Sequence, residues 1–324
     1  MRVFVAGGTG AIGRRLVPAL VARGHEVVAT TRRSEKVPIL EAQGARAVVV
    51  DALDATTVGA AVAEAAPDVI VHQATALAGA PNLRRFDRWF ATTNDLRTRG
   101  TDHLLAAARA AGVERFVAQS YTGWNNARQG GQVKDEDDQL DPHPLAAQSE
   151  SAAALRYLER AVTQAPLQGV VLRYGNFYGP GESESLVELI RKRRLPLIGD
   201  GAGVWSWVHL DDAAAATVAA VERGRPGVYN IVDDDPAPVA EWLPYLAELV
   251  GAKPPLRVPA WLGRLAAGAV PVRWMTEARG ASNAKAKRLL DWRPAWGTWR
   301  DGFRDGLGDL SAAAGTRPSG PEAV

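Results

Sequence analysis

The chain has 324 residues, of which 47% are hydrophobic, and this is enough for a sizeable core in one large domain or two. Lys+Arg 38 against Asp+Glu 36 leaves a formal net charge of +2, and the basic residues are scattered, which argues against a nucleic-acid partner. There is no Cys, the five His lie far apart, and no apolar run reaches the roughly 18 residues of a membrane helix, so we expect a cytoplasmic protein with no disulfide, no metal site and no membrane segment.

The first thirty residues predict a strand, a glycine-rich turn, a helix and a second strand. Val3–Ala6 is a short apolar run, Arg14–Arg23 has apolar residues at helical spacing, and Glu26–Thr31 is strand-like. The alternation continues with strands over Ala47–Val50, Val69–Val71, Arg115–Ala118 and Gly169–Leu172, and helices over Thr56–Ala65, Asp95–Ala111 and Ala147–Thr163. This order predicts an α/β fold with a Rossmann-type parallel sheet that has helices on both faces.

The pattern changes after about residue 180, where Pro and Trp become frequent and the segments become shorter. Eight of the ten Trp lie at or beyond position 205. We expect residues 1–180 to form the dinucleotide-binding domain, with 206–235 returning to it, and 181–205 and 236–310 to form a smaller C-terminal α+β substrate region. Residues 311–324 have too little apolar content to pack and are predicted to be a disordered tail.

The glycine-rich turn predicts a site for the pyrophosphate of a dinucleotide. Glycines allow a tight turn and a close approach of the backbone to the phosphates, and the free N–H groups at the start of the following helix favour an anion. The strand before the turn and the helix after it supply the context that this interpretation needs. The predicted contacts are Gly7, Thr9, Gly10, Ala11, Ile12 and Gly13.

The end of the second strand indicates which dinucleotide binds. An NAD-binding fold usually has Asp or Glu there to accept hydrogen bonds from the ribose. This sequence has Thr30–Thr31 followed by Arg32 and Arg33, with no carboxylate. Two guanidinium groups suit a 2′-phosphate, so the pattern favours NADP(H) over NAD(H).

Further motifs follow the glycine turn in a fixed order, and with it they resemble the extended short-chain dehydrogenase/reductases, the NAD-dependent epimerase/dehydratase group. The resemblance covers residues 1 to about 308. The matching segments are Asp51–Leu53, His72–Thr75, Leu172–Gly181, Val208–Ala213, Tyr229–Ile231 and Leu290–Pro294. Carried over to this chain, the resemblance implies cofactor contacts from Asp51, Ala52, Leu53, Gln73, Ala74, Thr75, Gln119, Tyr174 and Asn176.

The sequence departs from that family at its catalytic pair, Tyr-x-x-x-Lys, in which the phenol exchanges a proton with the substrate oxygen. Leu145 stands at the Tyr position and Ser149 at the Lys position, and none of the six Tyr in the chain is followed by Lys four residues later. The simocyclinone-type angucyclinone ketoreductases are similar in this respect. A smaller departure is Arg97, which replaces an Asn of the family, while Asn94 lies one turn earlier.

Other groups must then supply a proton if a ketone is reduced. The residues after the fifth strand make Ser120, Tyr121 and Thr122 the candidate catalytic residues, while a water or a substrate hydroxyl is the alternative source. Aromatic residues in the region where this family holds its substrate suggest an aromatic ligand. The candidate substrate contacts are Trp124, Tyr178 and Trp205.

Three functions remain open at this point. The first is an atypical NADPH-dependent ketoreductase that acts on a small molecule, for which a polycyclic aromatic polyketide is one candidate. The second is a sugar-nucleotide epimerase or dehydratase, and the third is a non-catalytic NADP(H)-binding sensor or scaffold. A homodimer formed through the helices near 95–111 and 147–163 also stays open, because the sequence does not show how apolar their outer faces are.

Overall fold

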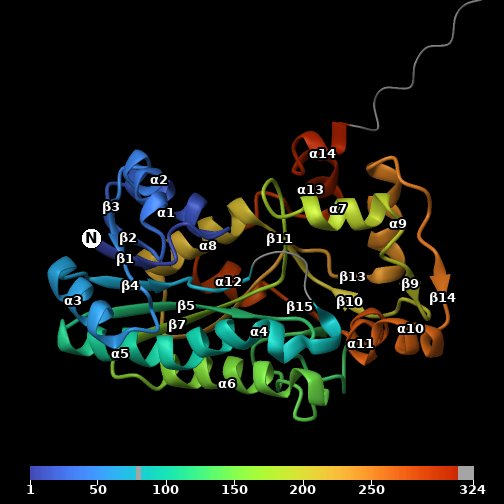
Figure 1. Cartoon of the computed structure of the whole chain (residues 1–324), viewed down its shortest axis with the longest axis horizontal. Helices are drawn as coiled ribbons and strands as arrows, with labels where there is room; N and C mark the ends of the chain where they lie inside the picture. The colour runs from blue at the N-terminus through green and yellow to red at the C-terminus, as the bar shows by residue number, and fades with distance from the viewer. Residues whose placement is uncertain (78–81, 313–324) are drawn as a thin grey trace, which may run out of the picture.

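A computed structural model describes residues 1–77 and 82–312 (Figure 1). Its centre is a seven-stranded sheet in the order β12-β7-β5-β4-β1-β2-β3, with every pair parallel. The strands are β1 (Arg2–Ala6), β2 (Glu26–Thr31), β3 (Arg46–Val49), β4 (Val69–His72), β5 (Arg115–Tyr121), β7 (Gln168–Tyr174) and β12 (Gly227–Ile231). The predicted Rossmann-type fold class is confirmed.

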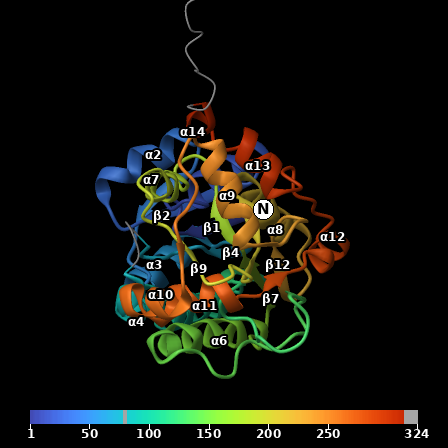
Figure 2. The same ribbon diagram turned by 90° about the vertical axis from the view of Figure 1, so that its right-hand side faces the viewer.

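Helices cover both faces of this sheet, which is how a parallel sheet buries its two apolar sides. One face carries α1 (Gly13–Ala22), α2 (Val37–Ala42), α8 (Leu210–Arg223) and α12 (Ala284–Leu289). The other carries α3 (Ala55–Ala65), α4 (Phe86–Asp95), α5 (Thr101–Ala110) and α6 (Ser149–Thr163). Figure 2 shows the two layers on opposite sides of the sheet. Alternate residues of each strand therefore belong to different cores, with Val117 on the α1/α8 side and Ala118 on the α5/α6 side.

The C-terminal region adds a third core beside the sheet, on the right in Figure 1. Its large buried side chains include Trp207, Trp242 and Trp299. The helices are α7 (Glu184–Arg191), α9 (Val239–Leu249), α10 (Ala260–Ala267), α11 (Ala269–Glu277), α13 (Trp299–Asp305) and α14 (Asp309–Ala312). Short strands pair as β8 (Asn176–Tyr178) with β11 (Trp207–His209), β10 (Val204–Trp205) with β13 (Ala237–Pro238), β9 (Leu197–Ile198) with β14 (Arg257–Val258), and β6 (Val133–Lys134) with β15 (Gly280–Ala281).

The helix predicted over Asp95–Ala111 begins earlier than expected. It starts as α4 at Phe86, passes through a π-helical turn at Leu96–Gly100 and ends as α5 at Ala110. The buried face of this first part includes the polar residues Thr93, Asn94 and Arg97. The sequence therefore lacks the regular spacing of apolar residues by which a helix is recognised. Single 3-10 turns lie at Ser34–Lys36, Leu83–Arg85 and Ala146–Gln148.

The end of the chain is only partly described. The predicted disordered tail, 311–324, overlaps α14, which runs to Ala312, and 313–324 lie outside the described residues. Within 1–77 and 82–312, no helix is both long enough and apolar enough to cross a membrane.

Candidate active site

The glycine turn between β1 and α1 leaves no room for side chains at two of its positions. Gly7 has φ +95°, and a Cβ on it would lie 2.8 Å from the backbone nitrogen of Ala74. A Cβ on Gly13 would collide with the carbonyl oxygens of Gly7 and Gly8. Among the described residues, no backbone group accepts a hydrogen bond from the N–H groups of Ala11 and Ile12. Open donors at a helix start fit a pyrophosphate, so the turn can hold a dinucleotide.

The ends of β2 and β3 lie next to this turn, on what we call its adenosine side because the sequence predicts the adenosine contacts there. Thr30 Oγ1 accepts a hydrogen bond from Gly7 N at 3.2 Å, and Thr31 Oγ1 accepts one from Arg33 N at 3.2 Å. Arg32 and Arg33 are exposed and have no acidic partner among the described residues. Asp51 Oδ1 accepts a hydrogen bond from Leu53 N at 3.0 Å, which fixes the turn after β3. The strands are parallel, so these groups lie at the same edge of the sheet.

The segment after β4 is held by buried side chains. Gln73 Nε2 donates to the Tyr174 hydroxyl at 3.0 Å, and that hydroxyl lies 2.7 Å from Thr217 Oγ1 on α8. His72 Nε2 donates to Leu96 O at 3.1 Å, and burial lowers the pKa of His72 to about 4, so the ring is neutral at neutral pH. The side chains of Gln73 and Tyr174, both predicted cofactor contacts, therefore tie β4, β7 and α8 together, while Ala74 and Thr75 remain partly exposed.

The three candidate catalytic residues do not share one site, because β5 continues to Tyr121 and its side chains alternate between faces. Ser120 Oγ donates to Glu159 Oε1 at 2.7 Å, and Glu159 is ion-paired with buried Arg173 at 2.6 Å. This cluster lies under α6. Thr122 is also buried and pairs with Asn126 through its hydroxyl at 3.0 Å.

Tyr121 is the member of this trio that remains partly exposed. Its hydroxyl donates to Asn176 Oδ1 at 3.1 Å, and Asn176 Nδ2 donates to Ser206 O at 3.1 Å. Burial raises the pKa of Tyr121, so the phenol is protonated at neutral pH. Gln119, a predicted cofactor contact, is partly exposed and lies on the same face of β5. The phenol and the Asn176 amide are thus hydrogen-bonded to each other on the partly exposed face of the strand end.

Beside Tyr121 the structure assembles what we call the aromatic wall: Phe86, Tyr121, Trp124, Trp205 and Trp274. Trp124 stacks against Tyr121 with ring centroids 6.0 Å apart and against Trp274 at 6.4 Å. Phe86 contacts Trp124 edge-on at 5.3 Å. Trp205 Nε1 donates to Trp274 O at 2.9 Å. Two of the candidate substrate contacts, Trp124 and Trp205, therefore lie in one cluster that joins the two regions of the chain.

Sequence reasoning missed two members of the wall and placed one residue in the wrong surroundings. Phe86 lies on the hidden first part of the long helix, and Trp274 on α11 belongs to no motif. Tyr178 was expected to contact substrate, but its side chain is fully buried between Trp207, Phe303 and Gly302. The phenol is part of the third core and offers no surface to a ligand in this structure.

The two positions at which the sequence resemblance predicts the family's catalytic pair, Leu145 and Ser149, lie at the start of α6. Leu145 precedes the 3-10 turn Ala146–Gln148 and is partly buried. Ser149 is exposed, and its Oγ donates to Ala146 O at 3.0 Å. Neither side chain can hold or transfer a proton as a phenol or an ammonium group does.

Comparisons with known proteins agree with this architecture. Residues 3–232 match the NAD dependent epimerase/dehydratase family. The chain is 46% identical to a 3-diazoavenalumate denitrifying reductase of Streptomyces sp., over 94% of this chain and 99% of that protein. It is 32% identical to a 4-hydroxy-2-methyl-3-oxo-4-farnesyl-3,4-dihydroquinoline-1-oxide ketoreductase of Stigmatella aurantiaca, over 78% of this chain and 74% of that one.

Among solved structures, UDP-glucose 4-epimerase of Thermus thermophilus in complex with NAD has a TM-score of 0.72 with this chain. The two are 27% identical, and the match covers 97% of this chain and all of the other. The fold is therefore shared over nearly the whole length. The chain belongs to the NAD dependent epimerase/dehydratase family, an enzyme family that uses a nicotinamide dinucleotide.

Proposed function

We propose that this protein is an NADPH-dependent reductase that removes a diazo group from an aromatic substrate and releases it as dinitrogen. The observation that carries the proposal is the pairing of two facts. A relative that is 46% identical over 94% of the chain is named as a denitrifying reductase of a diazo compound. The chain itself has Leu145 and Ser149 where the family has its proton-transferring pair.

The chemistry of a diazo group explains why that pair is dispensable. A bound reduced nicotinamide dinucleotide supplies a hydride. A hydride added to the outer nitrogen of an arenediazonium cation gives a neutral diazene, Ar–N=N–H. The nitrogen–hydrogen and carbon–nitrogen bonds of the diazene then break, the hydrogen that leaves nitrogen as a proton is returned to the ring carbon as its new C–H bond, and N2 leaves. Charge and atoms balance with no net uptake of a proton and no alkoxide to stabilise, whereas reduction of a ketone takes up one proton and develops an alkoxide.

The residues of the site fit an aromatic acceptor. The aromatic wall offers ring faces for stacking, of which Trp124 and Trp274 are partly exposed. Tyr121 and Asn176 border the wall through their mutual hydrogen bond. These residues position a flat substrate near the end of β5, and none of them has to supply a net proton to the product.

The cofactor preference follows from the adenosine side of the glycine turn. Arg32 and Arg33 are exposed, lack acidic partners among the described residues and directly follow β2. Guanidinium groups bind a phosphate through paired charge-assisted hydrogen bonds, so they favour the 2′-phosphate of NADPH over the bare ribose of NADH.

A ketoreductase is the second candidate, and one observation favours it. Tyr121 holds a protonated phenol at the open end of β5, where it could donate to a developing alkoxide, and a 32% identical relative is named as a ketoreductase. The two functions place different demands on this phenol.

A substrate panel tests the proposal. The purified protein is incubated with NADPH and either aromatic diazonium compounds or matched aromatic ketones, and the loss of the reduced-nicotinamide absorbance is followed against samples without protein. The proposal predicts protein-dependent oxidation with diazo compounds that greatly exceeds that with ketones. Turnover confined to ketones would establish the second candidate instead.

A further inference from the structure

Arg97 carries a buried positive charge that has no ionic partner in the described part of the chain. The residue is 8% exposed, it forms no ion pair within 1–77 and 82–312, and its Nη1 has no hydrogen-bond partner there. A buried charge normally has an opposite charge or hydrogen bonds that offset its desolvation. Among the described residues, the guanidinium lies over the ring of Phe90, whose centroid is 5.6 Å away.

The backbone around Arg97 is also unusual. Arg97 lies in the π-helical turn Leu96–Gly100, and its carbonyl oxygen accepts a hydrogen bond from Thr101 Oγ1 at 2.9 Å. Such turns occur mostly as single-turn insertions inside α-helices and are frequent at functional sites. Burial lowers the pKa of Arg97 to about 10, so the group keeps its charge at neutral pH. The nearby His72 is neutral there and does not compensate it.

A continuous series of rings connects this charge to the aromatic wall. Phe90 stacks on Phe86 with centroids 4.3 Å apart, and Phe86 contacts both Trp124 and Trp274 edge-on. A second buried donor, Nε2 of Gln148, also lacks a partner in the described residues. Gln148 lies at the start of α6, the helix that packs against the π-helical turn. The unpaired nitrogen of Arg97 suits a hydrogen-bond acceptor, and its positive charge favours an anionic one.

We propose that Arg97 is the anion-binding residue of the substrate site, and that the substrate carries an oxyanion, a phenolate or a carboxylate, on its aromatic framework. This rests on the proposed function for the assignment of the aromatic wall to the substrate. An oxyanion would pair with the guanidinium and accept hydrogen bonds from its unpaired nitrogen. It would also make an arenediazonium neutral overall, which removes the repulsion that a bare diazonium cation would meet near a buried guanidinium.

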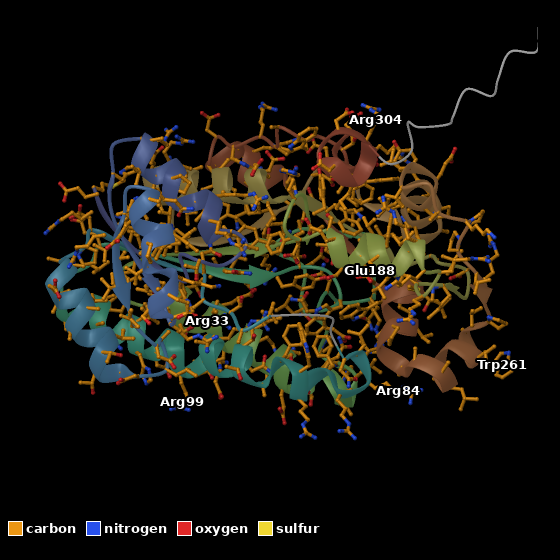
Figure 3. All side chains as sticks on the ribbon, turned by 45° about the horizontal axis from the view of Figure 1, so that its top comes forward. Arg33, Arg84, Arg99, Glu188, Trp261 and Arg304 are labelled. Carbon is orange, nitrogen blue, oxygen red and sulfur yellow. The ribbon has the colours of Figure 1, made fainter. Side chains whose placement is uncertain are left out.

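The experiment uses 4-nitrophenol, whose visible absorption reports whether the phenol is ionised, and its neutral methyl ether 4-nitroanisole. Both are titrated into the full chain in the presence of NADP+, and the bound phenol is then titrated with pH. The variants are Arg97→Gln, Arg97→Lys and, as the matched control, Arg99→Gln. Arg99 belongs to the same turn but is exposed, and Figure 3 shows it on the outer side of the helix layer.

An opposite charge within contact distance lowers the pKa of a bound acid by about 1 to 3 units. We therefore expect bound 4-nitrophenol to ionise at lower pH than the free phenol in the native protein and in Arg99→Gln. Arg97→Gln should abolish that shift and weaken phenolate binding by about 10- to 1000-fold, with 4-nitroanisole bound as before. Arg97→Lys should retain part of the shift.

The inference is overturned if the native protein does not bind the phenolate, if its bound phenol ionises as in free solution, or if Arg97→Gln leaves the shift in place. If Arg97→Gln fails to fold, the native titration and Arg97→Lys still decide the question. No diazo compound and no turnover enter this test. Failure of the diazo assay would therefore contradict the proposed reaction and not the binding of an anion by Arg97. Failure of the phenol titration would contradict the role of Arg97 and not the reaction.

Discussion

Replacing Tyr121 with Phe separates the two candidate functions most sharply. The substitution removes one hydroxyl and keeps the ring that stacks on Trp124 at 6.0 Å. The lost interaction is the hydrogen bond that the Tyr121 hydroxyl donates to Asn176 Oδ1 at 3.1 Å. The free energy of unfolding should fall by about 0.5–1.5 kcal/mol, the usual net value of one such bond.

The effect on turnover depends on whether the hydride acceptor needs a proton. General acid catalysis contributes about 10²- to 10⁴-fold, so Tyr121→Phe should lower kcat by that factor if the phenol protonates an alkoxide. A diazonium acceptor becomes neutral on gaining hydride, so kcat should change by no more than about 2-fold, a barrier change of under 0.5 kcal/mol.

The assay follows NADPH oxidation at saturating diazonium compound for the native protein and Tyr121→Phe, with thermal unfolding of both as the control for folding. A loss of about 100-fold or more in kcat, with the fold and NADPH binding intact, would refute the argument that this site works without a proton donor.

The remaining predictions concern the cofactor, the cluster under α6 and the buried imidazole. Arg32→Ala with Arg33→Ala should weaken NADPH binding by about 1.5–3 kcal/mol, measured by titration, and leave NADH binding nearly unchanged; an equal loss for both would rule out the 2′-phosphate contact. Ser120→Ala should lower the free energy of unfolding by about 1–3 kcal/mol, because Glu159 loses its 2.7 Å donor, while kcat stays unchanged; a large fall in kcat would place Ser120 in the catalytic site. Burial lowers the pKa of His72 from 6.5 to about 4, so the unfolded chain binds its proton first and stability should fall as the pH decreases through this window, by up to about 3 kcal/mol; urea unfolding of His72→Gln should lack this part of the pH dependence, and identical profiles would contradict it.

Much of the fold could be predicted because its signals are local. Glycine at Gly7 and Gly13 is required by close backbone contacts, and the apolar runs of β1, β2 and β4 are bounded by clear turns. The order of strands and helices then restricts the sheet to a parallel one. The prediction of this fold needed no knowledge of contacts between distant residues.

The arrangement of the site depended on features that the sequence hides. The predicted fifth strand ended at Ala118, whereas β5 continues to Tyr121, and this extension sends Ser120 and Tyr121 to opposite faces. Trp274 meets Trp124 only through the packing of α11 against the Rossmann region. The burial of Tyr178 follows from the position of α13, which comes more than one hundred residues later. Such contacts are set by tertiary packing and not by local pattern.

The central claim is that reduction releases the diazo nitrogen without a proton-donating side chain. The most direct measurement uses an aromatic diazonium compound whose two diazo nitrogens carry a heavy isotope, and counts the labelled N2 by mass spectrometry against NADPH consumed. The account predicts one labelled N2 for each NADPH oxidised, together with the arene that carries hydrogen in place of nitrogen, in the native protein and in Tyr121→Phe alike. Protein-dependent NADPH oxidation that yields no labelled N2, or retention of nitrogen on the product, would contradict it.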